Sequence, residues 1–197
     1  AAFQVSGRRI LLTGGAGFIG SNLLDVLLEA GDQVTVVDDF NRYYAPSIKW
    51  ANLAAHESNP SLRLIEADIC DASLWDELDA DDGWDAVIHI AARAGVRPSI
   101  EQPLLYMRTN VDGTAEALRW SCSGRRPIPF VFASSSSVYG DDNTPPYSEQ
   151  GSQPSPVSPY GASKLAAEGL LRGRASTDSL PIAILRFFTV YGPRQRP

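Results

Sequence analysis

The sequence predicts a doubly wound α/β fold, in which helices cover both faces of a parallel sheet. Short apolar runs alternate with helical patterns from one end of the chain to the other, which is typical of parallel strands joined by helical crossovers. The apolar runs are continuously hydrophobic, as expected of strands that are buried on both faces. With 197 residues, the chain can form one well-cored domain, or one domain and the start of a second.

Six strands and five helices follow from these patterns. The stretch 141–159 contains five prolines together with Ser, Asn and Gly residues, so a long loop is expected there. Loops of this kind inside compact domains are often functional. We expect strands at 8–13, 33–38, 62–66, 86–91, 128–134 and 182–188, and helices at 18–30, 46–56, 73–78, 103–121 and 160–174.

The composition excludes several classes of protein. The net charge of -6 and the pI near 4.9 argue against a nucleic-acid surface, which needs clustered Lys and Arg. No apolar run is long enough to span a bilayer, and the N-terminus lacks a signal-peptide pattern. Cys70 and Cys122 have no redox or metal-ligand spacing, and His56 and His89 belong to no ligand-spaced cluster. We therefore expect a cytoplasmic protein without a metal site.

A glycine-rich segment follows the first expected strand and opens the first helix. The segment Thr-Gly-Gly-Ala-Gly-Phe-Ile-Gly at 13–20 can be read as GxGxxG on Gly15, Gly17 and Gly20, or as GxxGxxG on Gly14, Gly17 and Gly20. In both readings glycine lets the backbone approach a pyrophosphate, whose charge then lies at the positive end of a helix. The pattern predicts a Rossmann-type dinucleotide site, with a plain structural turn as the alternative.

Acidic residues end the second and third expected strands. Asp38 comes about 20 residues after the glycines, where a carboxylate accepts hydrogen bonds from the adenosine ribose. The same charge would repel a ribose 2'-phosphate, which favours NAD over NADP. Asp39 is expected to be a solvated loop residue. Asp68 could cap the following helix, or it could receive the adenine amino group beside the Ile69 backbone.

Tyr160 and Lys164 stand four residues apart at the start of the last expected helix, a spacing that places them on one helical face. A phenol has a pKa near ~10 and is a poor base at neutral pH unless a nearby cation lowers that pKa. Lys164 would supply the cation. The alternative is a surface tyrosine beside a solvated lysine.

The serine run 134–137 ends the fifth expected strand. Ligands of open α/β sheets bind outside the carboxyl ends of the strands, so one of these hydroxyls could donate to the substrate oxygen that Tyr160 deprotonates. A serine-rich turn is the alternative.

Together these segments resemble the extended short-chain dehydrogenase/reductase family, and within it the UDP-sugar 4-epimerases, with UDP-glucuronate 4-epimerases the most similar. The likeness covers essentially the whole chain. The matching segments are TGGAGFIGS, VVDDFNRYY, EADIC, HIAARAGVRPS, TNVDGT, FASSSSVYG, YGASK and RFFTVYGPRQRP, in family order.

The resemblance implies that NAD is the cofactor and a UDP-sugar the substrate. Ser135 resembles the catalytic hydroxyl, with Ser136 the next choice, and both would contact the sugar. Tyr160 resembles the base, which contacts both the sugar and the cofactor. Lys164 resembles the electrostatic partner of the base and a ligand of the nicotinamide ribose. The implied cofactor residues are Gly14, Gly17, Phe18, Ile19 and Gly20 for the pyrophosphate, Asp38 and Asn41 for the adenosine ribose, Asp68 and Ile69 for the adenine, and Ala91, Ala92, Ala94 and Ser134 along the cleft, with Asn110 behind it.

The substrate is inferred from the last segment. UDP-glucose 4-epimerases tend to have Asn where this chain has Thr189, whereas the Phe-Phe-Thr-Val-Tyr-Gly-Pro run is similar to UDP-glucuronate 4-epimerases. A uronate needs a hydroxyl and a cation near its carboxylate, which Thr189 and Arg196 would provide, with Arg97 a second candidate cation. Sugar 4,6-dehydratases are the alternative, but an Asp-Glu pair follows their catalytic hydroxyl and this chain has Ser136 and Ser137 there. The segment AARAGVRPS fits UDP-glucuronate decarboxylases poorly.

The chain ends soon after the sixth expected strand. We expect residues 1–191 to form the NAD-binding domain with the Tyr-Lys pair, and 192–197 to begin a substrate-binding region whose small C-terminal domain is absent from this chain. Relatives often form homodimers through helices that resemble 103–121 and 160–174, although the apolar faces of these helices could equally belong to the core.

Overall fold

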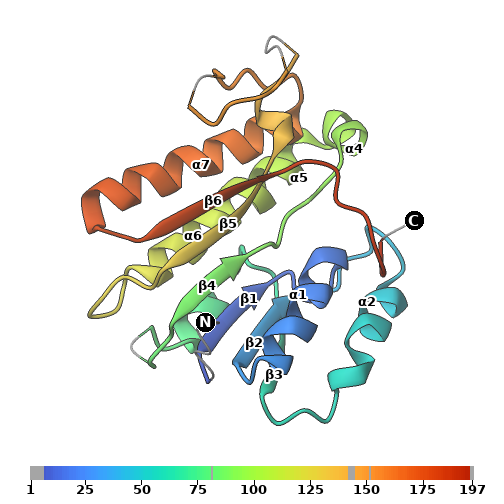
Figure 1. The fold of residues 1–197 in the computed structure, drawn as a ribbon, viewed down its shortest axis with the longest axis vertical. Helices are drawn as coiled ribbons and strands as arrows, with labels where there is room; N and C mark the ends of the chain where they lie inside the picture. The colour runs from blue at the N-terminus through green and yellow to red at the C-terminus, as the bar shows by residue number, and fades with distance from the viewer. Residues whose placement is uncertain (1–6, 81, 142–144, 151, 196–197) are drawn as a thin grey trace.

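The protein folds around a six-stranded parallel sheet, shown as a ribbon in Figure 1. The computed structural model describes residues 7–80, 82–141, 145–150 and 152–195. The strand order is β3-β2-β1-β4-β5-β6, and every pair of neighbours is parallel. This topology confirms the doubly wound α/β fold. The strands are β1 (Arg9–Thr13), β2 (Gln33–Asp38), β3 (Leu62–Glu66), β4 (Ala86–His89), β5 (Phe130–Ser135) and β6 (Ile182–Phe187).

Helices connect the strands and cover the sheet. The segment 141–159 forms no strand, and no helix before Pro159, in its described residues, in agreement with the predicted loop. The helical elements are α1 (Phe18–Glu29), α2 (Pro46–Leu53), η1 (Ala54–His56), α3 (Ala72–Glu77), α4 (Val96–Glu101), α5 (Pro103–Met107), η2 (Arg108–Asp112), α6 (Gly113–Ser121), η3 (Ser136–Val138) and α7 (Pro159–Asp178).

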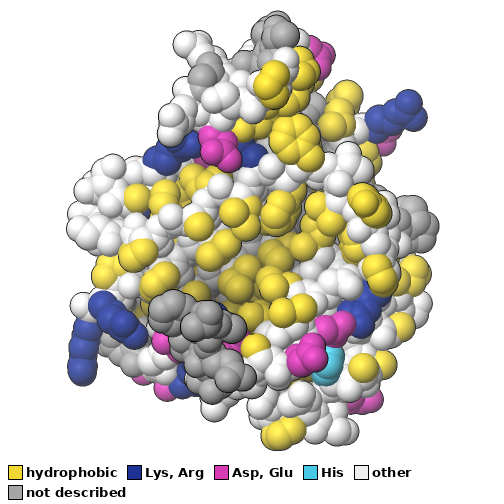
Figure 2. Space-filling model, in the orientation of Figure 1, with side chains coloured by type: hydrophobic (Ala, Val, Ile, Leu, Met, Phe, Trp, Pro, Cys, Tyr) yellow, Lys and Arg dark blue, Asp and Glu magenta, His cyan; other side chains and the backbone are white. Residues whose placement is uncertain are grey.

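The sheet has a core on each face, because successive strand residues point to opposite sides. Leu11 of β1 belongs to the cluster under α3, α6 and α7, whereas Ile10 and Leu12 belong to the cluster under α1 and α2. On β6, Ile182 and Ile184 pack against the first cluster. Leu185, which points the other way, is 44% exposed, and Figure 2 shows apolar side chains gathered on this face over β5 and β6.

Two strand ends differ from the prediction for reasons that the hydrogen bonds explain. β4 ends at His89, because the amides of Ile90 and Ala91 both donate to the carbonyl of Thr13 as the chain turns away. β5 begins at Phe130, because the amide of Ile128 donates to the carbonyl of Ser121 at the end of α6.

The helices differ from the prediction at three places. The expected helix 103–121 is interrupted by the π-helical turn η2, which places Asn110 in the interior. The short helix α4 was not expected; Gly95, whose φ is 106°, precedes it. α7 continues to Asp178, beyond the predicted end at 174, and stops where Ser179 adopts a left-handed conformation. Among the residues that the structure describes, no helix combines the length and apolar character needed to cross a membrane.

The strand order reverses between β1 and β4, so the loops that follow these strands diverge. A crevice forms at such a point, at the carboxyl ends of the strands, and it is where ligands of doubly wound sheets bind.

Candidate active site

A cavity of about 750 Å³ lies at this crevice, between the loops that follow the six strands. Its size is in the range of cofactor and substrate sites. The structure brings most of the predicted site residues together around it. The lining includes Gly14, Gly17, Phe18, Ile19, Gly20, Asp38, Asn41, Asp68, Ile69, Ala91, Ala92, Ala94, Ser134, Ser135, Ser136, Tyr160, Lys164 and Thr189.

The glycines of the GxxGxxG reading, Gly14, Gly17 and Gly20, are the ones that line the cavity. Gly14 has a φ of 74°, and a Cβ there would lie 2.7 Å from the amide nitrogen of Ala91. A Cβ on Gly20 would lie 2.1 Å from the carbonyl oxygen of Gly14. Gly15 instead packs against the Val36 side chain and is not in the cavity lining. Its role is therefore to let the turn approach β2.

The start of α1 is suited to an anion. Gly17 is the N-cap, and no side chain in the described part of the chain caps this helix. The first amides of an α-helix have no intrahelical partner, so those of Phe18 and Ile19 remain available beside the cavity. Together with the positive end of the helix dipole, they fit the pyrophosphate of a dinucleotide.

The adenosine end is built around the buried carboxylate of Asp38. Its Oδ2 accepts from the amide of Ala16 at 3.2 Å, and its Oδ1 accepts from the amide of Phe40 at 3.0 Å and from Lys49 Nζ at 2.8 Å. Asp39 also lines the cavity, with a side chain 31% exposed and 3.6 Å from Lys49 Nζ. Asp39 is therefore a partly exposed loop residue that also borders the cavity.

Asp68 does not cap the helix that follows it. The N-cap of α3 is Asp71, whose side chain accepts from the amide of Ser73. Asp68 accepts from the amide of Cys70 at 2.9 Å and pairs with Arg108 at 3.3 Å. Of the two roles considered for Asp68, its place in the cavity lining fits the adenine contact.

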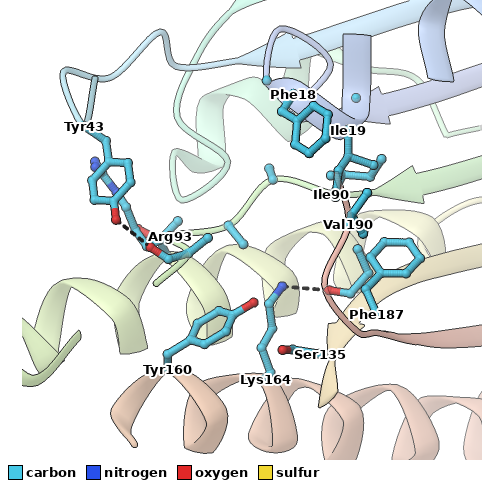
Figure 3. Close-up of a pocket in the computed structure, with 18 of the residues that line it drawn as sticks. Phe18, Ile19, Tyr43, Ile90, Arg93, Ser135, Tyr160, Lys164, Phe187 and Val190 are labelled. Carbon is cyan, nitrogen blue, oxygen red and sulfur yellow. Dashed lines mark hydrogen bonds between the residues drawn. The ribbon is translucent and has the colours of Figure 1, made fainter. Parts of the chain in front are cut away.

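At the opposite end, Tyr160 and Lys164 project from α7 into the cavity (Figure 3). Lys164 is 3% exposed, its Nζ donates to the carbonyl of Ala133 at 2.8 Å, and it lies 4.8 Å from the centre of the Phe132 ring. Burial lowers the pKa of Lys164 to about 7. The edge of the Tyr160 ring faces Tyr106 at 6.3 Å.

The two buried serines at the end of β5 differ in their partners. Ser134 donates through Oγ to Glu168 Oε1 at 2.6 Å, so its hydroxyl points into the interior and only the remainder of the residue faces the cavity. Ser135 accepts through Oγ from the amide of Ser137 at 3.1 Å. This bond leaves the Ser135 hydroxyl proton available for a ligand, which fits the catalytic hydroxyl predicted at this position.

Asn110 lies behind the cavity and positions the loop that follows β4. Its Oδ1 accepts from the amide of Arg93 at 2.7 Å, and its Nδ2 donates to the carbonyl of Arg93 and to Ser163 Oγ. Ser163 in turn donates to the carbonyl of Tyr160. Asn110 thus links the cavity loop to the catalytic helix, and it is not itself part of the lining.

A buried histidine continues this link to the glycine-rich turn. Burial, and to a smaller extent the charge of Lys164, lowers the pKa of His89 to about 3, so the ring is neutral. Thr114 donates to the carbonyl of Asn110, so it accepts from His89 Nε2, and Nδ1 accepts from Thr13. The chain of bonds joins β1, β4 and η2.

The three residues predicted to bind the substrate carboxylate are not all found at the cavity. Thr189 lines the cavity, whereas Arg97 is an exposed residue of α4 outside the lining. Arg196 lies outside the described residues. The segment before it runs along α1, where Asn22 donates to the carbonyl of Pro193 at 3.0 Å and Arg194 pairs with Asp25 at 2.7 Å.

The motifs missed several lining residues, namely Tyr43, Tyr44, Lys49, Arg93 and Gln195. The composition contained a signal for Lys49: the chain has 15 arginines and only two lysines, Lys49 and Lys164. Both lysines are buried at the cavity. A surface that uses arginine throughout makes each lysine a candidate for a specific role.

The fold and the cavity define the class: a dinucleotide-binding α/β domain with a Tyr-Lys pair beside the cofactor cleft. The chain matches the NAD dependent epimerase/dehydratase family over residues 10–197. It therefore belongs to this family, which confirms NAD as the cofactor and the resemblance found in the sequence.

Individual relatives refine the comparison. UDP-glucuronate 4-epimerase 3 of Arabidopsis thaliana is 41% identical over 192 residues, which are 97% of this chain and 44% of that protein. A solved UDP-glucuronic acid 4-epimerase from Bacillus cereus, in complex with UDP-glucuronic acid and NAD, has a TM-score of 0.84 at 36% identity, covering 96% of this chain and 59% of that one. A dTDP-glucose 4,6-dehydratase from Streptomyces venezuelae has a TM-score of 0.86 at 35% identity, with coverages of 96% and 58%. The chain thus spans about half the length of these relatives.

Proposed function

We propose that the protein carrying this chain is an NAD-dependent 4-epimerase of nucleotide sugars, and that UDP-glucuronate and UDP-galacturonate are its substrates. The observation that carries the proposal is the convergence of Tyr160, Lys164 and Ser135 on one wall of the cavity. Opposite them lie Phe18 and Ile19, at the start of α1 (Figure 3). The wall with Tyr160 handles the proton of the sugar, and the start of α1 holds the cofactor.

The residues that would hold NAD follow from the geometry. The amides of Phe18 and Ile19 would hold its pyrophosphate, and the carboxylate of Asp38 would bind the adenosine ribose. Lys164 lies at the nicotinamide end. Bound there, NAD would supply a reversible hydride acceptor for C4 of the sugar, so that inversion at C4 would occur without net oxidation.

Tyr160 acts as the base on the sugar 4-hydroxyl and later returns the proton. Because burial brings the pKa of Lys164 to about 7, the lysine readily changes protonation state near neutral pH. Ionisation of Tyr160 places a negative charge beside it, which favours the charged lysine. The pair therefore stabilises a phenolate that an isolated tyrosine would not form at this pH. Ser135 donates its hydroxyl proton to the sugar oxygen and orients it.

Fewer residues of the site support the choice of a uronate substrate than support the Tyr-Lys mechanism. It is supported by the curated relatives, which are UDP-glucuronate 4-epimerases, and by the place of Thr189 in the cavity lining. Arg196 remains the predicted partner of the uronate carboxylate. The predicted homodimer and cytoplasmic location stay predictions.

A 4,6-dehydratase is the second candidate, because the solved dehydratase matches the fold as well as the epimerases do. Loss of water from the sugar requires an acid and a base in addition to the Tyr-Lys pair. Here Ser136 and Ser137 follow Ser135 at the cavity wall, and neither can supply the acid. The site therefore favours epimerisation.

The test is to incubate the full-length gene product with UDP-glucuronate and, separately, with UDP-glucose, without added NAD, and to follow C4 by proton NMR. We expect preferential conversion of UDP-glucuronate to its 4-epimer. Preference for UDP-glucose would keep the epimerase and overturn the uronate. Loss of water from either sugar, or stoichiometric release of NADH, would contradict 4-epimerisation itself.

A further inference from the structure

The second lysine of the chain lies at the adenosine end of the cavity, 115 positions before the catalytic lysine. The side chain of Lys49 is 6% exposed, and its Nζ lies 2.8 Å from Asp38 Oδ1 and 3.6 Å from Asp39 Oδ1. The next residue of α2, Trp50, stacks on Phe40 in the loop after β2 with ring centres 3.9 Å apart, which joins this part of α2 to the loop that contains Asp39. Lys49 is therefore fixed against the carboxylates and faces the cavity.

Asp38 cannot satisfy an adenosine ribose alone. A carboxylate has about four acceptor positions, and three donors already use those of Asp38. One position is left for one ribose hydroxyl. Lys49 has three N–H donors, of which one is used on Asp38 and a second points to Asp39 at a longer distance. Nζ also lies 5.6 Å from the centre of the Tyr44 ring, but the third N–H forms no hydrogen bond with the described residues and can bind the other ribose hydroxyl.

The same lysine changes the charge of this end of the cavity. Asp38 and Asp39 bring two negative charges, Lys49 brings one positive charge, and Arg93 reaches to 4.0 Å from Asp39 Oδ2. The carboxylate that should repel a 2'-phosphate is thus balanced by cations that attract it.

We infer that Lys49 is a specificity-determining residue of the cofactor site: it binds the adenosine ribose together with Asp38, and it sets how strongly NAD is preferred over NADP. The inference concerns the adenosine end alone. It requires the cofactor site but no sugar chemistry, so its failure would leave the proposed epimerisation untouched.

The test measures the dissociation constants of NAD and NADP by calorimetry on the protein freed of cofactor, at a pH of about 8, where carboxylates are ionised. For Lys49→Met we expect NAD to bind about tenfold more weakly, as for the loss of one hydrogen bond to a charged group. NADP should weaken by at least tenfold more, because Asp38 is then uncompensated. Asp38→Asn should shift the ratio of the two constants toward NADP, and Lys49→Arg should keep the wild-type ratio.

A purely structural Lys49 would predict a different result, in which Lys49→Met weakens both cofactors by the same factor and leaves their ratio unchanged. That outcome, or unchanged binding of both, would overturn the inference. If Lys49→Met fails to fold, the double variant Asp38→Asn with Lys49→Met removes both charges together. Its NAD-to-NADP ratio should then lie between those of Asp38→Asn and the wild type, and a ratio identical to that of Asp38→Asn would contradict a role for Lys49.

Discussion

The two ends of the cavity each contain a buried lysine, and the lysines differ in their surroundings. Lys49 is paired with Asp38 and borders Asp39. Lys164 has a carbonyl oxygen and an aromatic ring as its neighbours, and burial lowers its pKa to about 7. One lysine is engaged with carboxylates. The other can gain or lose a proton, which a base of the Tyr-Lys kind requires.

The catalytic end also contains a buried carboxylate, but its recorded partners are Ser134, Arg172 and Arg186. Glu168 is fully buried, and it accepts from both Nε and an Nη atom of Arg186, from Arg172 and from Ser134. Burial alone would raise the pKa of Glu168, but the hydrogen bonds from Arg186 and Ser134 outweigh it and lower the pKa. These donors occupy Glu168, and within the described part of the chain no carboxylate forms an ion pair with Lys164. The difference between the two lysines thus originates in where each neighbouring carboxylate is engaged.

The largest effect is expected when the base is removed from the catalytic end. Tyr160→Phe should lower turnover by about 10³-fold, within the range for general acid–base catalysis, because the phenol that is proposed to take the sugar proton is then absent. The dissociation constant of NAD should stay within about twofold, since the adenosine end and the start of α1 are unchanged. Turnover and calorimetry on the same preparation give both values.

Tyr147→Phe is the matched control, because Tyr147 lies in the loop before α7 and outside the cavity lining, where its ring stacks on Tyr139 and lies tilted against Phe188. It should leave turnover near the wild-type value. Substantial turnover by Tyr160→Phe would contradict the assignment of proton transfer to Tyr160.

The next effect tests the buried carboxylate of the catalytic end. Glu168→Gln leaves the Arg186 guanidinium, whose side chain is 9% exposed, without a counter-charge. Breaking a buried pair in this way costs roughly 3 kcal/mol of unfolding free energy, which urea denaturation measures.

The exposed pair Glu116–Arg119, whose side chains are 33% and 52% exposed, provides the control. Glu116→Gln should change stability by less than about 0.5 kcal/mol. Equal effects of the two substitutions would contradict the structural role assigned to Glu168.

The sequence predicted the positions of the cofactor residues better than it predicted the ion pairs around them. Order along the chain decides where the glycine-rich turn and Asp38 lie in a doubly wound sheet, so both could be placed at the cavity from the motif alone. The same pattern could not choose between Gly14 and Gly15, because that choice depends on which glycine meets Val36 of the neighbouring strand.

Features that depend on packing between distant segments were not accessible in this way. Lys49 of α2 pairs with Asp38 at the end of β2, and Phe40 and Trp50 stack between the same two segments; the periodicity of α2 indicates neither contact. Ser134 turns inward because Glu168 lies opposite it, 34 positions along the chain. The π-helical turn that buries Asn110 resembles an ordinary helix in the pattern of apolar residues.

The smallest effect is expected in the pH dependence of the unfolding free energy, to which Lys164 contributes. Burial lowers the pKa of Lys164 from 10.5 to about 7, so between these values the unfolded chain binds more protons than the folded chain. Stability therefore rises with pH in this window, and the cost of burying the charged lysine is fully present only below it. From about pH 7 to about pH 9 this group should add roughly 2 kcal/mol to the unfolding free energy of the wild type. Lys164→Met should lack that increment, as urea denaturation at both pH values would show. An identical pH dependence in the variant and the wild type would mean that Lys164 keeps its charge throughout, and the catalytic end would then resemble the adenosine end.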